Sequence, residues 1–313
     1  MEQELCKAVD QTQTTGYLHP LYAASFAEFG IAYELPECGG WIIERNIPGS
    51  TDRDAMGCYP IFCCRDWNLL PRDVANLEGK LVSLALVTDP FGNFRLHDLM
   101  QYFDICIHFK DHYIADMSQP IDKIISKKHR INARRALRKL VVDACLDPHS
   151  YVDEWARLYA CLIERHSIQG IRKFSKSVFE SQLRVPGVVY FRVLFDDRLV
   201  GGQIYYLQND VAYSHLTALT DEGYTLRASY AAQWAAMEYF AGKVSWLSLG
   251  GGAGLNHTGD DGLANFKRGW ASGTRPVYFC AQILDRQKYT ELARAAANPD
   301  STYFPLYRAG EYA

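Results

Sequence analysis

The chain has 313 residues and a formal net charge of -3 at pH 7, and 48% of its residues are hydrophobic. This composition excludes a disordered chain, and the length suits one large domain or two of ordinary size. The small net charge excludes a global field toward nucleic acid or anionic membranes, so any such binding must use a local patch. No apolar run in the sequence approaches the ~20 residues of a membrane-spanning helix, and residues 1–13 lack a signal-peptide core. We therefore predict a cytoplasmic protein.

The first half of the chain is weakly periodic. We expect short elements in it, with Asp89-Pro90 as a turn after the third strand. The expected strands cover 41–44, 59–63, 81–87 and 105–109, and the expected helices cover 22–29 and 71–77. The nine cysteines are odd in number and form no C-x-x-C pair, so we expect reduced core residues and no metal site.

A basic helix follows near the middle of the chain. The segment 123–139, KIISKKHRINARRALRK, contains eight Lys and Arg residues, with apolar residues at helical spacing between them. We place a domain boundary here, between domains at 1–120 and 121–313. The basic side chains form either a solvated helix face or a contact with the phosphates of tRNA, a nucleotide-linked precursor or a lipid diphosphate. The residues we would test for phosphate contact are Arg130, Arg134 and Arg135.

The second half has a clear order of elements. We expect a strand at 140–146, helices at 151–166 and 175–183 with Ser175 as N-cap, and strands at 188–195, 199–207 and 211–218. A polar loop at 220–224, a long helix at 226–240, a buried strand at 244–249, a short helix from 260 and a strand at 277–284 follow. This order is that of the GNAT fold and predicts a mixed α/β sheet, and we expect the first half to form a second, degenerate GNAT-like domain in tandem with it.

A glycine-rich loop links the last two of these strands. The stretch LSLGGGAGLNHTGDDGLANFKRGW, 247–270, matches neither phosphate-binding fingerprint, G-x-x-x-x-G-K-[ST] or G-x-G-x-x-G. It is either a flexible connection where positive φ is needed, or bare backbone lining a cleft before a helix whose N-terminus attracts anions. Lys267 on that helix is either a solvated lysine or a cation that binds a phosphate or stabilises an oxyanion.

Several stretches resemble the Fem-like transferases, also described as having a BioF-like acetyltransferase domain. They are LGGGAG, DDGLANFKRGW, SKKHRINARRALRK, ERHSIQGIRKFS and AYSHLTALTDEGYTLRASYAAQWAAMEYF. The resemblance covers roughly residues 120–285 well and the first half loosely. It implies two GNAT domains in tandem and transfer of an amino acid from aminoacyl-tRNA to an amine of a peptidoglycan precursor. Other members of the group act in natural-product pathways with aminoacyl-tRNA or acyl-CoA as donor.

The chain departs from the group's pattern in two ways. It lacks the long coiled-coil insertion of some members. It also lacks a full Q/R-x-x-G-x-G/A pyrophosphate loop before the long helix, where only Gly223 and Arg227 are present. This gap disfavours acetyl-CoA as donor and leaves acyl-CoA as the alternative to aminoacyl-tRNA.

The resemblance and the residues together predict a site. Lys267 matches the lysine of the group's Phe-Lys pair, which implies stabilisation of the tetrahedral intermediate or of a substrate phosphate. His215 shares a strand face with Tyr213 and is either a base for the attacking amine or a core histidine. Substrate-assisted deprotonation needs no base, and Asp260 and Asp261 either take the proton or cap a helix. The predicted substrate-binding residues are Tyr213, Gly250, Gly251, Gly252, Tyr224, Ser229, Tyr230 and Tyr59. Tyr59 lies in a Gly-x-Tyr-Pro segment, which is either an approach to the acceptor or a plain turn. Arg227 is a predicted phosphate contact.

The sequence thus predicts an amide-forming acyltransferase. The donor is an activated ester or thioester, with aminoacyl-tRNA favoured over acyl-CoA, and the acceptor is a primary amine of a peptide, a peptidoglycan precursor or a natural product. No metal and no tightly bound cofactor is expected. An alternative of another class is a catalytically silent GNAT-like protein that binds nucleic acid through the basic helix.

Overall fold

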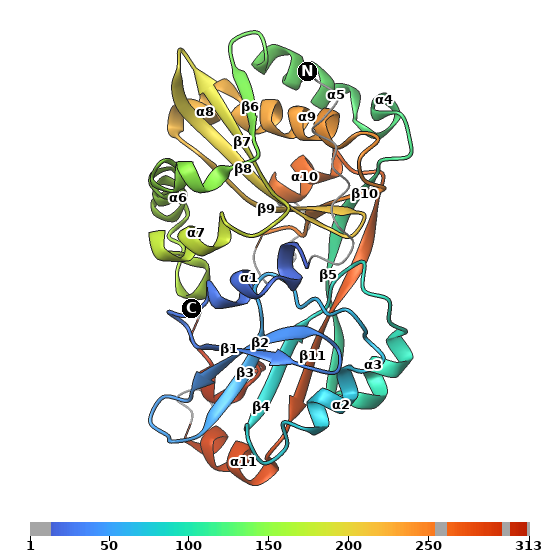
Figure 1. The fold of residues 1–313 in the computed structure, drawn as a ribbon, viewed down its shortest axis with the longest axis vertical. Coiled ribbons are helices and arrows are strands. Elements are labelled where there is room, and N and C mark those ends of the chain that lie inside the picture. Colours follow the sequence, from blue (N-terminus) through green and yellow to red (C-terminus); the bar gives the residue numbers. More distant parts are fainter. Residues whose placement is uncertain (1–13, 254–261, 296–300, 312–313) are drawn as a thin grey trace.

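The computed structural model describes residues 14–253, 262–295 and 301–311 (Figure 1). Its centre is one mixed sheet of eleven strands in the order β1-β2-β3-β4-β11-β5-β10-β9-β8-β7-β6. The strands are β1 (Ile31–Leu35), β2 (Gly40–Asn46), β3 (Arg53–Gly57), β4 (Ser83–Val87), β5 (Ile105–Asp116), β6 (Val141–Cys145), β7 (Val188–Phe195), β8 (Arg198–Gln208), β9 (Val211–Leu219), β10 (Trp246–Gly250) and β11 (Gly273–Ile283).

Helices lie on both faces and at the ends of this sheet. The α-helices are α1 (Pro20–Ala24), α2 (Leu70–Ala75), α3 (Leu96–Tyr102), α4 (Ile121–Ile124), α5 (Lys127–Ala136), α6 (Val152–His166), α7 (Lys176–Gln182), α8 (Asp221–Leu226), α9 (Ala228–Phe240), α10 (Gly262–Arg268) and α11 (Arg286–Arg294). The 3-10 helices are η1 (Gly16–Leu18), η2 (Pro148–Tyr151), η3 (Gly170–Arg172) and η4 (Leu306–Arg308). Across the described ranges, every helix is too short or too polar to span a bilayer.

The second half confirms the predicted order of elements. Strands β6 to β9 are antiparallel, and β10 joins β9 in parallel. Successive side chains of a strand point to opposite faces. Tyr205 therefore packs with α9 on one face, while Tyr206 packs with the cluster under α6 and α7 on the other.

Strands β5 and β11 join the two halves of the molecule. They pair antiparallel from Gly273↔Ile114 to Ala281↔Ile105, and β11 also pairs with β4 while β5 also pairs with β10. Figure 1 shows both strands running from the lower group of strands into the upper group. The predicted strand 277–284 therefore lies beside strands of the first half, and the domain boundary at 120 stays a prediction.

Two local predictions were wrong, and a third held only in part. The segment 59–63 is not a strand; β3 lies earlier, and after it Phe62 makes a single bridge to Thr88, since Pro60 has no N–H for a ladder. The expected loop at 220–224 is helix α8, whose first turn is capped by the Thr220 hydroxyl. Ser175 occupies the N-cap position of α7 as predicted, but its hydroxyl makes no capping bond and donates to Glu28.

Candidate active site

Two glycines of the glycine-rich stretch, at the end of β10, have a stereochemical explanation. Gly250 has a φ of +73°, which side-chain-bearing residues rarely adopt. A Cβ on Gly251 would lie 2.5 Å from Lys110 Cδ and 3.4 Å from His112 Cδ2. Both positions therefore need glycine, one for backbone conformation and one for the close approach of β5.

Lys267, on α10, contacts this end of β10. Its Nζ donates a 2.6 Å hydrogen bond to the Gly251 carbonyl, and a Cβ on Gly250 would lie 3.2 Å from the same Nζ. The side chain is partly buried. The structure thus brings together three predicted site residues, Lys267, Gly250 and Gly251. Gly252 follows in irregular backbone.

His112 is a member of this group that the sequence analysis missed. It is 8% exposed, and its Nδ1 has no hydrogen-bond partner within the described part of the chain. Burial, with the nearby charges of Lys267 and Lys110, lowers its pKa to about 3. The imidazole is therefore neutral at pH 7 beside two cations. We missed it because the predicted strand ended at Phe109, whereas β5 continues to Asp116.

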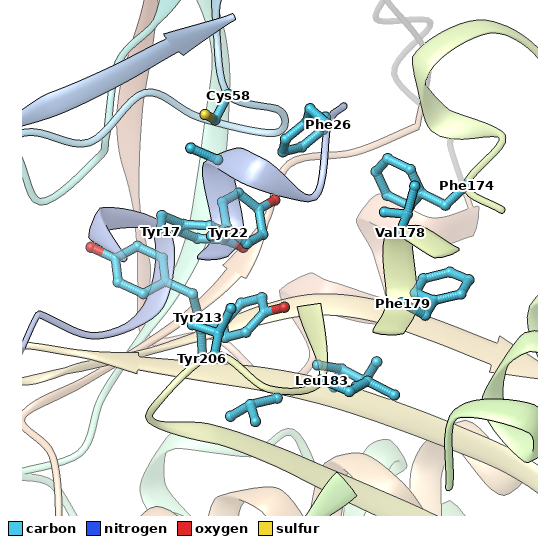
Figure 2. Close-up of a cluster of buried hydrophobic side chains, with 14 of the residues drawn as sticks. Tyr17, Tyr22, Phe26, Cys58, Phe174, Val178, Phe179, Leu183, Tyr206 and Tyr213 are labelled. Carbon is cyan, nitrogen blue, oxygen red and sulfur yellow. The ribbon is translucent and has the colours of Figure 1, made fainter. Parts of the chain in front are cut away.

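Tyr213 and His215 lie in a different place, within the aromatic cluster between the halves. In Figure 2, Tyr17 and Tyr22 lie above Tyr206 and Tyr213, with Phe174 to one side. His215 Nε2 lies 3.2 Å from Gln182 Oε1, and its Nδ1 lies 3.2 Å from Tyr17 Oη. Because Oε1 can only accept, Nε2 carries the proton and Nδ1 accepts from the tyrosine.

Burial lowers the pKa of His215 to about 3. The ring is therefore neutral, and its acceptor nitrogen is in use. His215 can accept a proton from a substrate only after the Tyr17 hydroxyl leaves Nδ1.

Asp89 anchors Tyr213 in the same cluster. The Tyr213 hydroxyl lies 3.0 Å from both carboxylate oxygens, and the Phe91 N–H donates to Asp89 Oδ1 at 2.9 Å. Burial raises the pKa of Asp89 to about 6, against the lowering effect of these bonds and of Arg275. The sequence identified Asp89 as a turn residue, which it is, but gave no sign of its contact with β9.

Tyr59 belongs to this cluster as well. Its carbonyl accepts from the Tyr22 hydroxyl, and its ring packs edge-on against Phe174 at 6.0 Å between centroids. Burial raises its pKa. Its contacts within the described residues are with core aromatics rather than with Lys267.

The remaining predicted residues lie where α5, α8 and α9 meet. Tyr230, in the first turn of α9, packs against His129 and Phe266, which ties α9 to α5 and α10. Arg227 donates to Asn132 of α5 at 3.0 Å, and Ser229 is partly buried beside it. Tyr224 of α8 contacts His166 at 3.4 Å.

The basic helix presents its arginines to solvent. Arg130 pairs with Asp122 at 3.0 Å, whereas Arg134 and Arg135 are exposed and form no ion pair within the described residues. Ala133 and Ala136 on the opposite side are buried against α9. The predicted amphipathic helix is confirmed as α5, and its charged face is exposed to solvent.

The connection between β9 and α9 is filled by helix α8. The N–H of Gly223 donates to the Thr220 hydroxyl, that of Tyr224 to the Thr220 carbonyl and that of Arg227 to the Tyr224 carbonyl. Three backbone donors of this connection are therefore already used and do not face a ligand.

Two further sequence predictions concern metals and the glycine loop. Within the described ranges, no three His, Cys, Asp or Glu side chains gather as metal ligands would. The eight cysteines of those ranges are free, and Cys161 is exposed rather than in the core. Asp260 and Asp261 lie outside the described residues.

Comparison with known proteins gives the fold. No family model matches the sequence, and no curated protein matches it. The crystal structure of FemX superimposes with a TM-score of 0.64 at 13% identity, over 87% of this chain and 93% of that one.

Two other structures superimpose over similar lengths. L-PGS from Bacillus licheniformis has a TM-score of 0.54 at 12% identity, over 89% of this chain and 96% of that one. A C-terminal domain (DUF2156) assigned to a lysylphosphatidylglycerol synthetase from Agrobacterium fabrum has 0.60 at 12%, over 82% and 84%. At these identities the likeness establishes the fold, which is the Fem-like mixed α/β fold that the sequence resemblance predicted.

Proposed function

We propose that this chain is an acyltransferase that joins an aminoacyl or acyl group to a primary amine, with aminoacyl-tRNA as the favoured donor. The observation that carries the proposal is the position of Lys267 at the end of β10, where its Nζ, Gly250 and Gly251 meet beside His112. The shared fold with FemX and L-PGS supports it.

The chemistry follows from this arrangement. The amine lone pair attacks the carbonyl carbon of the activated ester, and the carbonyl oxygen gains negative charge. The ammonium group of Lys267 stabilises that charge, and its own bond to Gly251 holds it in place beforehand. Collapse of the intermediate forms the amide bond and breaks the ester bond, and the leaving oxygen departs with the electron pair.

The amine must also lose a proton. We propose His215 as the base once Tyr17 releases its Nδ1, with transfer within the substrate as the alternative. The second route needs no rearrangement of the cluster between the halves.

The donor proposal rests on two surfaces. Helix α8 uses the backbone N–H groups with which a GNAT enzyme would hold a pyrophosphate, which disfavours acyl-CoA. The exposed face of α5, with Arg134 and Arg135, is complementary to an RNA backbone. We further propose Arg130, Arg227, Tyr224, Ser229 and Tyr230 as the residues that border the donor.

Donor consumption tests this proposal. Purified protein is incubated with a mixed pool of charged tRNA and, separately, with a panel of acyl-CoA thioesters, each with pooled amine acceptors. RNase-sensitive loss of one aminoacyl ester supports the proposal and identifies the amino acid. Thiol release instead makes the chain an acyl-CoA-dependent N-acyltransferase. RNA binding without loss of either donor supports the catalytically silent nucleic-acid-binding protein.

A further inference from the structure

A pair of buried arginines lies away from the candidate active site. Arg45 of β2 and Arg308 of η4 are 7% and 8% exposed, and Asp54 of β3, between them, is 0% exposed. Arg45 Nε lies 3.2 Å from Asp54 Oδ1, and Arg308 Nη2 lies 3.0 Å from the same oxygen. Two guanidinium groups and one carboxylate leave a buried charge of +1, which requires a further anion.

Glu311 supplies that anion from the outer side. Its Oε1 lies 3.3 Å from Arg45 Nη1 and 3.5 Å from Arg308 Nη1. Charge-assisted N–H···O bonds are usually about 2.7–2.9 Å long, so this carboxylate is held loosely. Its side chain is also 31% exposed, whereas that of Asp54 is fully buried.

A cavity of about 190 Å³ adjoins the loosely held carboxylate. Its lining combines the charged or polar residues Arg45, Asn46, Arg308 and Glu311 with Phe29, Gly170 and Ile171. The volume is several times the roughly 30 Å³ of one water molecule. The cavity therefore has guanidinium groups that recognise a planar anion and apolar residues that accommodate a short hydrocarbon group.

We propose that Arg45 and Arg308 form a binding site for a small carboxylate with a short apolar group, which Glu311 occupies until that ligand displaces it. The ligand's carboxylate takes the two outer Nη1 donors, its apolar group contacts Phe29 and Ile171, and the Glu311 carboxylate moves into water. Asp54 keeps both guanidinium groups in place throughout. The charged part of the site lies apart from the proposed transferase chemistry, because Arg45, Arg308 and Glu311 bond to Asp54, to the Asn46 carbonyl and to one another. Phe29 and Ile171, by contrast, also pack against the aromatic cluster around His215.

Binding of isovalerate to the full chain tests this site. Calorimetric titrations compare wild type with E311A, using isovalerate and its neutral analogue isovaleramide. We expect E311A to bind isovalerate at least about tenfold more tightly, because in wild type the tethered Glu311 competes at an effective concentration in the millimolar range. We expect no binding of isovaleramide to either protein. Acetate, which cannot reach Phe29 and Ile171, should bind E311A more weakly than isovalerate does.

Two controls separate this site from a general charge effect. E291A removes an exposed glutamate of α11 whose carboxylate accepts a hydrogen bond from Gln287, and its isovalerate affinity should equal that of wild type. E311Q repeats the comparison if E311A does not fold. Equal isovalerate affinity in wild type and both Glu311 variants, absence of binding to the variants, or equal binding of isovaleramide would overturn the proposal.

Discussion

Tyr17 and His215, 198 positions apart in the sequence, share a 3.2 Å hydrogen bond between Oη and Nδ1. The bond joins a segment near the start of the chain to β9 of the second half. It also keeps the one predicted histidine of the site neutral and engaged. The state of this pair decides between the two proposed routes for the amine proton.

Y17F tests what the bond contributes. The variant leaves a buried imidazole nitrogen without its donor, which should lower the free energy of unfolding by about 1–2 kcal/mol. Urea unfolding measures the change. Y33F, at an exposed tyrosine of β1, is the matched control and should be neutral. A neutral Y17F would show that the bond does not stabilise the fold.

The titration of His215 gives stability a pH dependence. Its folded pKa, about 3, lies below the ordinary 6.5, so between these values the unfolded chain binds a proton that the folded chain does not. Stability should therefore fall as pH decreases through this window, by up to about 1.4 kcal/mol per pH unit from this group. H215Q should reduce the slope by that amount, while the effects of His112 and Asp89 are present in both proteins. Parallel pH profiles for wild type and H215Q would contradict the burial of a neutral His215.

Lys267 is the decisive residue for the proposed chemistry. K267M keeps the length of the side chain and removes its charge, so we expect kcat for transfer to fall about 10²–10³-fold. R268Q, at the exposed neighbour that contacts Asn265, is the control and should retain activity. Steady-state rates of donor loss decide the matter, and wild-type turnover by K267M would refute the role of this lysine.

Gly250 tests the same role without changing a charge. In G250A, the new methyl group would lie 3.2 Å from Lys267 Nζ, at a φ of +73°. We expect a loss of about 1 kcal/mol of stability from the backbone conformation and a fall in kcat from displacement of the ammonium group. G273A, where the added Cβ meets nothing within 4 Å, should leave kcat unchanged. The paired variants are compared by thermal unfolding and donor loss.

The basic face of α5 should control RNA affinity. Replacing Arg134 and Arg135 by glutamine removes two exposed charges, so the dependence of log K on log salt should weaken by about 1.4–1.8, with uniform loss across tRNA sequences. R286Q, at an exposed arginine of α11, is the control. Filter binding at several salt concentrations gives the slopes, and an unchanged slope would remove α5 from the donor surface.

The second half could be predicted from sequence because its signals are local. Residues 188–195 form a run of β-branched, aromatic and other apolar residues, interrupted only by Arg192, that ends at Asp196-Asp197, and β7 has those bounds. The amphipathic pattern at 151–166 likewise became α6. Lys267 was predicted from the Phe-Lys pair of a short motif, and both residues of that pair lie on the single helix α10.

The first half and the rest of the site depend on distant contacts. The pairing of β5 with β11 and with β10 extends β5 to Asp116, and the local pattern does not show partners so far along the chain. His112 falls in that extension. Tyr17 and Asp89 join the cluster of β9 only in the folded chain. These residues are recognisable by tertiary structure, and a single sequence carries no local sign of them.

The ladder between β5 and β11 has a mechanical consequence. β11 bonds to β4 of the first half, and β5 bonds to β10 of the second half. Separating the two halves would therefore require breaking the run of backbone hydrogen bonds between β5 and β11 in the middle of the sheet. We therefore expect substrates to enter by movement of side chains and loops, while the strands of the sheet stay paired. The radius of gyration in solution should accordingly stay the same when a small amine acceptor is added.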